Sequence, residues 1–99
     1  MNKDLKKLFK DLVEAHSPSG FEQSAQKVFA DFARKYVPTE DVKTDVHGNV
    51  IALKKGKGNI RLMICGHADE IGLMVTYIDD NGYLYFAPVG GVDPAILPG

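Results

Sequence analysis

The sequence predicts an α/β fold made of two amphipathic helices, a hairpin and a central strand, with further strands after them. Apolar residues recur at helical spacing between residues 5 and 36. Turn signals that contain glycine separate short alternating or apolar runs, as in β-hairpins. The run Ile60–Cys65 is apolar on both faces, a pattern typical of a strand covered by other layers. These three observations together favour the α/β class.

Two segments near the amino terminus have the apolar spacing of amphipathic helices. The first places these apolar residues on one face: Leu5, Leu8, Phe9, Leu12 and Val13. The second carries a similar stripe: Ala25, Val28, Phe29, Phe32, Ala33 and Tyr36. Ser19 and Glu22 have the spacing of a capping box at the start of the second helix, and Pro38 marks its end. We expect both stripes to pack on a core.

Two later segments have the pattern of β-hairpins. Residues 42–53 contain an alternating run and an apolar run on either side of a turn in which Gly48 supplies unusual backbone angles. Residues 71–86 contain two apolar runs around Asn81-Gly82, the strongest short hairpin signal. Each pair of runs is therefore predicted to form two paired strands.

The stretch His67-Ala68-Asp69-Glu70 interrupts apolar sequence at the end of the predicted central strand. Unpartnered ionisable groups are costly to bury, so these side chains are expected to be paired or metal-bound. Alternation along an extended chain puts His67 and Asp69 on one side and sends Glu70 to the other. A neutral imidazole can bind a zinc-like ion while the carboxylate holds the proton of the other ring nitrogen. The alternative is a histidine capped by its neighbouring aspartate at a strand end.

A different arrangement would use Cys65, His67 and Asp69 as a self-contained zinc site, since all three alternate onto one face. Alternate residues of a single strand rarely surround a tetrahedral ion, whose ligands usually come from turns or several elements. We expect Glu70 to make a fixed structural contact, because it points away from His67.

Composition limits the possible partners and compartment. The formal net charge of -1 argues against general binding to nucleic acid or to anionic membranes. The single cysteine, Cys65, cannot form an internal disulfide and is interpreted as a small buried hydrophobe in a reducing compartment. No secretory signal or membrane-spanning run is visible in the 99 residues, so a cytoplasmic location is the expectation.

A series of ordered motifs resembles the tetrahedral (TET-type) dinuclear-metal aminopeptidases, the glutamyl and deblocking aminopeptidases of metallopeptidase family forty-two. The motifs are Ser17-Pro18-Ser19-Gly20-Phe21-Glu22, Asp45-Val46-His47-Gly48-Asn49, His67-Ala68-Asp69-Glu70-Ile71-Gly72-Leu73-Met74-Val75, Ile78-Asp79, Gly82-Tyr83-Leu84, Phe86, Pro88-Val89-Gly90-Gly91, Asp93-Pro94 and Leu97-Pro98-Gly99. The similarity covers nearly the whole chain. It implies a partial α-β-α sandwich, with residues 1–69 in the metallopeptidase domain and residues 70–99 opening an inserted β-rich assembly domain.

The resemblance also implies the roles of individual residues. His67 would be a metal ligand, and Asp69 would be the acidic residue of the catalytic site that positions and tunes it. The complete enzyme would bind two divalent metal ions, zinc or cobalt, act on peptide substrates and assemble as a homo-oligomer. Its other ligands and its general base would lie beyond residue 99, so the turn-rich tail after residue 87 is read as that of a truncated chain. The 99 residues alone are expected to be inactive, because a catalytic zinc normally takes three protein ligands.

A non-catalytic function is the alternative to the aminopeptidase. A small α/β domain could bind partner chains through an unpaired strand edge and its apolar tail. Such a module has no need of His67 and Asp69 at a strand end. Metal dependence would therefore distinguish the two hypotheses.

Overall fold

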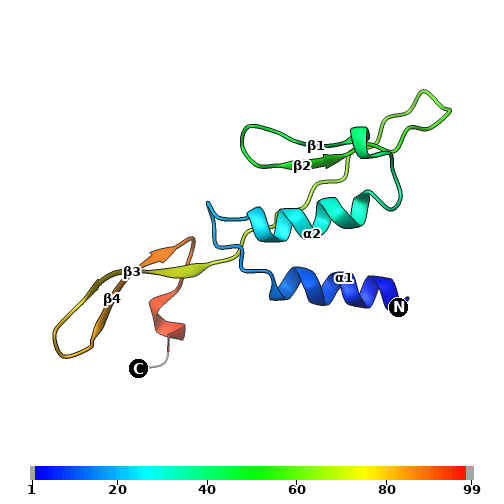
Figure 1. Ribbon diagram of the computed structural model, residues 1–99. Helices are drawn as coiled ribbons and strands as arrows, with labels where there is room; N and C mark the ends of the chain where they lie inside the picture. The colour runs from blue at the N-terminus through cyan, green and yellow to red at the C-terminus, as the bar shows by residue number, and fades with distance from the viewer. Residues whose placement is uncertain (1, 98–99) are drawn as a thin grey trace.

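Helices and separate antiparallel hairpins make up the computed structural model, which describes residues 2–97 (Figure 1). The helices are α1 (Lys3–Glu14) and α2 (Gln23–Ala33), with the short 3-10 turns η1 (Thr39–Asp41) and η2 (Pro94–Ile96). The strands are β1 (Val42–Thr44), β2 (Val50–Ala52), β3 (Gly72–Ile78) and β4 (Leu84–Val89). This mixture of elements confirms the predicted α/β class.

The helix α1 forms where the first apolar stripe predicts it. Asn2 caps its amino terminus, since the Asn2 side chain accepts a hydrogen bond of 3.1 Å from the backbone N–H of Asp4. Lys7 and Asp11 pair one turn apart on the exposed face. The apolar face lies toward α2 but is only partly covered, because Phe9 and Val13 remain exposed. The stripe thus predicts the helix correctly but overstates its burial.

The helix α2 lies between α1 and the β1–β2 hairpin and carries most of the small core (Figure 1). The buried cluster consists of Ala30, Ala33 and Val42, with Val37 and Val50 packed against it. Small alanine side chains allow the hairpin to approach the helix closely. The predicted capping box is wrong, because the N-cap residue is Glu22 and no side chain caps the helix. The Glu22 carboxylate accepts instead from the N–H of Gly20 at 2.6 Å.

The predicted hairpin at residues 42–53 is confirmed as the antiparallel pair β1 and β2. Its turn is organised by Asp45, whose Oδ1 accepts hydrogen bonds of 2.9 Å from the backbone N–H groups of His47 and Asn49. The side-chain amide of Asn49 donates to Asp45 Oδ2 at 2.8 Å. Gly48 has a φ of 89°, a left-handed conformation that favours glycine.

These bonds make the turn sensitive to acid. The pKa of Asp45 lies below its ordinary value of 3.8. The largest cause is the hydrogen bond from the side-chain amide of Asn49. The backbone N–H groups of Asn49 and His47 and the charge of His47 act in the same direction. The stabilisation from ionised Asp45 is therefore complete above pH 3.8 and is lost as the pH falls through the lower folded-state pKa. We expect the N–H groups of His47 and Asn49 to lose protection from hydrogen exchange in that acid range. The Asp45→Asn variant should not show this loss, and an equal loss in that variant would contradict the assignment.

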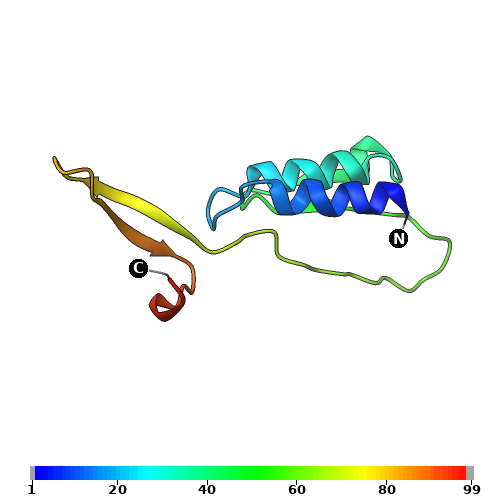
Figure 2. The same cartoon turned by 90° about the horizontal axis from the view of Figure 1, so that it is seen from below.

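The prediction of a buried central strand at residues 60–65 is wrong for this chain. Residues 53–69 loop away from β2 and return toward β3 without forming a strand (Figure 2). Ile60, Leu62 and Ile64 are 93%, 84% and 89% exposed, and Cys65 is exposed rather than buried. A strand needs a neighbour to pair with, and residues 2–97 place none beside this segment. The two-sided apolar pattern is therefore not covered by any other element among residues 2–97.

The second predicted hairpin is confirmed as the antiparallel pair β3 and β4. Asp79 Oδ1 accepts from the backbone N–H groups of Asn81 and Tyr83, and Gly82 has a φ of 84°. The strand β4 continues to Val89 and so extends beyond the predicted residues 83–86. Pro88 is tolerated because β4 is an edge strand in a pair. Of the turn-rich tail, Pro98 and Gly99 lie outside the described residues.

The chain is elongated, with the β3–β4 hairpin projecting from the helical part (Figure 2). Its radius of gyration is 18.1 Å and its extents are 63 × 32 × 23 Å. A compact domain of this length would have a radius of gyration of roughly 13 Å. Many apolar side chains are consequently exposed on both hairpin strands and on residues 60–64. Within the described part of the chain, neither helix combines the length and the apolarity that crossing a membrane requires.

Candidate functional site

The site forms where residues 17–19, after α1, meet residues 69–70, before β3. Pro18 and Glu70 form a parallel bridge. The N–H of Glu70 donates to the carbonyl of Ser17 at 2.9 Å, and the N–H of Ser19 donates to the carbonyl of Glu70 at 3.2 Å. The Glu70 carboxylate also accepts from the N–H of Ser17 at 3.0 Å. Glu70 therefore makes the structural contact expected of it, and joins segments about fifty residues apart.

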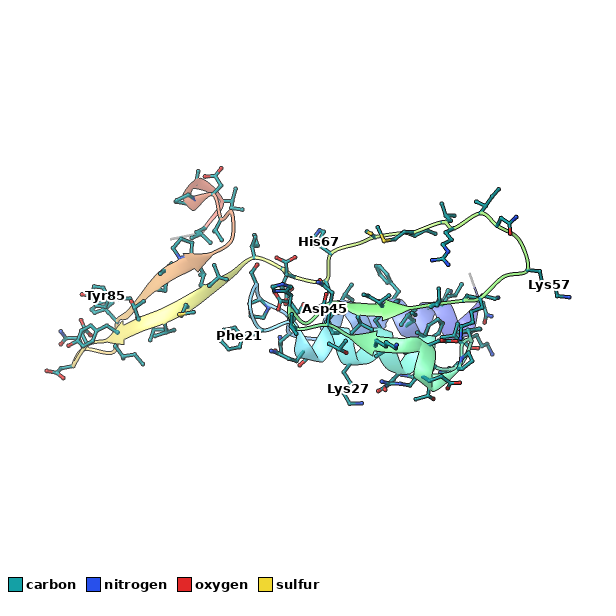
Figure 3. The ribbon with its side chains drawn as sticks, turned by 90° about the horizontal axis from the view of Figure 1, so that it is seen from above. Phe21, Lys27, Asp45, Lys57, His67 and Tyr85 are labelled. Carbon is teal, nitrogen blue, oxygen red and sulfur yellow. The ribbon has the colours of Figure 1, made fainter. Side chains whose placement is uncertain are left out.

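His67 and Asp69 contact each other, as alternation along the chain predicts. Nδ1 of His67 lies 2.9 Å from Asp69 Oδ1 and 3.1 Å from the Asp69 carbonyl oxygen. Both oxygens accept hydrogen bonds, so Nδ1 must carry the proton. A neutral ring then has its lone pair on Nε2. The His67 side chain is 86% exposed, which leaves this nitrogen accessible near the turn that contains Asp45 (Figure 3).

The carboxylate of Asp69 is held from both sides. Its Oδ2 accepts a hydrogen bond of 2.6 Å from the hydroxyl of Ser19, while Oδ1 accepts from His67. The Ser19 hydroxyl, followed by the His67 ring, keeps the pKa of Asp69 below its usual value. Sequence reasoning missed Ser19 because its spacing to Glu22 fits a capping box. That spacing assigns the Ser19 hydroxyl to the helix, so it gives no signal of a contact with Asp69.

A hollow of about 150 Å³ adjoins the imidazole of His67. Its lining comes from the start of α2, the β1–β2 turn and the His67 segment: Glu22, Gln26, His47, Gly48, Asn49, Gly66, His67, Ala68 and Asp69. A larger hollow of about 700 Å³ lies beside α2 and the β1–β2 hairpin and is not lined by His67. We place the candidate site at the smaller one, because the paired side chains of His67 and Asp69 line it and do not line the larger hollow.

The ligands available in this chain do not complete a metal site. Among residues 2–97, no three His, Cys, Asp or Glu side chains lie close enough together to hold a metal ion. The hypothesis of a self-contained zinc site from Cys65, His67 and Asp69 is therefore wrong. His67 fits the geometry of a single ligand oriented by a carboxylate. Its assignment as a metal ligand, with Asp69 in the catalytic site, stays a prediction.

Residues 48–99 match the family model of the M42 glutamyl aminopeptidases. A protein of Acetivibrio thermocellus, provisionally named an aminopeptidase, is 45% identical over 89 residues, which cover 90% of this chain and 25% of that protein. The lysyl aminopeptidase of Pyrococcus furiosus is 40% identical over 91 residues, which cover 91% of this chain and 25% of the enzyme. The chain thus spans about a quarter of the length of these relatives.

Solved structures agree with the sequence relatives. An aminopeptidase from the archaeon Desulfurococcus kamchatkensis superposes with a TM-score of 0.78 at 40% identity, over 87% of this chain and 24% of that one. The TET aminopeptidase of Thaumarchaeota archaeon SCGC AB-539-E09 also has a TM-score of 0.78, at 35% identity, over 89% of this chain and 24% of that one. This chain belongs to the M42 glutamyl aminopeptidase family and matches the amino-terminal part of its members.

Proposed function

We propose that this chain is the amino-terminal part of a metal-dependent aminopeptidase in which His67 is one of the metal ligands. The observation that carries the proposal is the contact of His67 Nδ1 with Asp69 Oδ1 at 2.9 Å. It fixes the proton on Nδ1 and leaves the exposed Nε2 with a lone pair. Histidines that bind metals commonly donate their other N–H to a carboxylate in this manner.

His67 would hold one of two divalent ions, zinc or cobalt, and Asp69 would keep its ring oriented. When bound, such a pair of ions polarises a scissile carbonyl and lowers the pKa of water. A catalytic zinc takes three protein ligands, whereas only His67 is proposed from this chain. The other ligands and the general base would come from the part that corresponds to the remaining three quarters of the relatives. We therefore expect the 99 residues alone to be inactive on peptides.

Assembly and location are part of the same proposal. The exposed apolar residues of β3 and β4 include Leu73, Met74, Tyr77 and Phe86. A hairpin with this surface suits the opening of an assembly domain in a homo-oligomer, and one structural neighbour is named a TET aminopeptidase. The single cysteine, Cys65, is exposed and free, which suits a reducing cytoplasm.

The test uses a chimera in which this chain replaces the matching segment of the Pyrococcus furiosus lysyl aminopeptidase. We call this protein the lysyl chimera. With added zinc or cobalt, we expect it to hydrolyse a lysyl chromogenic substrate and the 99-residue chain to be inactive. His67→Ala should reduce the activity of the lysyl chimera to background, because a metal ligand is lost. Metal content measured on the purified proteins should fall with the activity.

The matched control is His16→Ala, which removes an exposed imidazole outside the site. This variant should keep the activity of the lysyl chimera. Activity in the 99 residues alone would contradict the ligand assignment, and full activity in His67→Ala would contradict the role of His67.

The exposed segment at residues 60–64 favours the second candidate, a non-catalytic interaction module. Its extended backbone and apolar side chains could pair with a partner strand. Binding of that kind would not need a metal. An inactive lysyl chimera, together with capture of a partner chain that is unaffected by chelators and by His67→Ala, would favour this module over the aminopeptidase.

A further inference from the structure

We propose that Ser19 is a positioning residue whose hydroxyl orients the Asp69 carboxylate and thereby holds His67 in the tautomer protonated on Nδ1. The inference about the tautomer stands on the geometry of this chain. Its consequence for catalysis rests on the proposed function.

The three side chains form one continuous series of hydrogen bonds. The Ser19 hydroxyl donates to Asp69 Oδ2 at 2.6 Å, and Asp69 Oδ1 accepts from His67 Nδ1 at 2.9 Å. Because the two oxygens belong to one rigid carboxylate, holding Oδ2 also sets the direction of Oδ1. The two bonds together leave neither oxygen of Asp69 unused.

The backbone that carries Ser19 is held independently of the Asp69 side chain. The backbone of residues 17–19 is fastened to Glu70 through the bridge already described, and Ser17 is buried. The N–H of Phe21 donates to the carbonyl of Pro18 at 2.8 Å, which closes a turn around Ser19. Gly20 follows in a left-handed conformation with a φ of 92°. No side chain caps α2, so the Ser19 hydroxyl is not used by the helix and donates to Asp69 instead.

An exposed imidazole needs such an orienting group. His67 is 86% exposed, so packing does little to fix its ring. Asp69 is itself 41% exposed, and its side chain could rotate without a second partner. Losing the Ser19 bond would free the carboxylate and reduce the time that it spends facing Nδ1. The proton would then be favoured on Nδ1 mainly by the Asp69 carbonyl oxygen at 3.1 Å, so it would spend more time on Nε2, and Nε2 would present its lone pair less often.

The experiment measures the tautomer ratio of His67 by ¹⁵N NMR in the complete 99-residue chain labelled in its imidazoles. Spectra are recorded near pH 8.5, where imidazoles are largely neutral. We expect Ser19→Ala to lower the ratio of the Nδ1–H to the Nε2–H tautomer by about threefold to tenfold, the equilibrium effect of one lost hydrogen bond. Ser19→Thr keeps a hydroxyl and should restore most of the ratio.

Two controls separate positioning from a general disturbance of the loop. Ser24→Ala removes an exposed hydroxyl from α2 and should leave the ratio unchanged. In an Asp69→Ala background, Ser19→Ala should have no further effect, because the group through which Ser19 acts is gone. An unchanged ratio in Ser19→Ala would overturn the proposal, as would an equal change in both backgrounds. Failure of the proposed function would appear separately, as full activity of the lysyl chimera that carries His67→Ala.

Discussion

Replacing Asp69 with alanine is expected to lower kcat/KM of the lysyl chimera about 100-fold, near the upper end of the range for losing a carboxylate that orients a metal ligand. The change removes the carboxylate acceptor of the His67 Nδ1–H and leaves only the backbone carbonyl of residue 69, at 3.1 Å, to hold the ring. Asp69→Asn should cost less, about 10-fold. Its amide oxygen can still accept from His67, while its NH₂ group faces a Ser19 hydroxyl that is able to accept.

Steady-state kinetics and metal content should be measured together on these variants. A lower metal content would show that Asp69 acts through the affinity of His67 for the metal. The control is Asp80→Ala, which removes an exposed carboxylate from the β3–β4 turn and should leave kcat/KM unchanged. Wild-type kinetics in Asp69→Ala would show that the contact at 2.9 Å has no catalytic role.

The second large effect is a loss of stability, which we expect when Ala30 in the core between α2 and the β1–β2 hairpin is replaced by aspartate. Ala30 is 6% exposed and packs with Ala33 and Val42, the cluster that joins α2 to β1. Ala30→Asp would place a carboxylate in this apolar cluster, where the nearest cations, Lys27 and Arg34, already pair with Asp31, at a cost of about 3 kcal/mol. That is a large part of the stability of a small domain. We expect the protection of the β1 and β2 amides from hydrogen exchange to collapse.

The matched variant is Ser24→Asp, which adds the same side chain to an exposed position in the first turn of α2. A negative charge there is favourable toward the helix dipole, so protection should be kept or slightly increased. If Ala30→Asp and Ser24→Asp gave equal protection, the cluster at Ala30 would not be holding the hairpin on the helix.

The elements that could be predicted from the sequence are those whose cause is local. The helices α1 and α2 follow from apolar spacing within a dozen residues. Each hairpin turn contains a glycine with positive φ, and an aspartate three residues earlier accepts hydrogen bonds from backbone N–H groups of the turn. The closeness of His67 and Asp69 is also local in origin, because alternation along an extended backbone puts both side chains on one side. Each of these features would be expected in any chain that contains the same short segment.

The features that could not be predicted depend on distant residues. The hydrogen bond from Ser19 to Asp69 joins residues 50 positions apart. The sequence offers a nearer partner for Ser19, because its spacing to Glu22 fits a capping box, although Glu22 accepts from Gly20 instead. The apolar run at residues 60–65 predicts a covered strand from its composition, but composition does not say whether another segment of the chain covers it. Residues 2–97 contain no such cover, so the segment is exposed, and Cys65 with it.

The exposed run at residues 60–65 also makes the chain prone to aggregate. It is six residues long, has no proline and includes four large exposed hydrophobic residues: Ile60, Leu62, Met63 and Ile64. Segments of this composition stack between copies as cross-β zippers when nothing else pairs with them. Arg61 is the single charge within the run and acts as its gatekeeper. These six residues are thus an aggregation liability in the 99-residue chain, restrained by one guanidinium group.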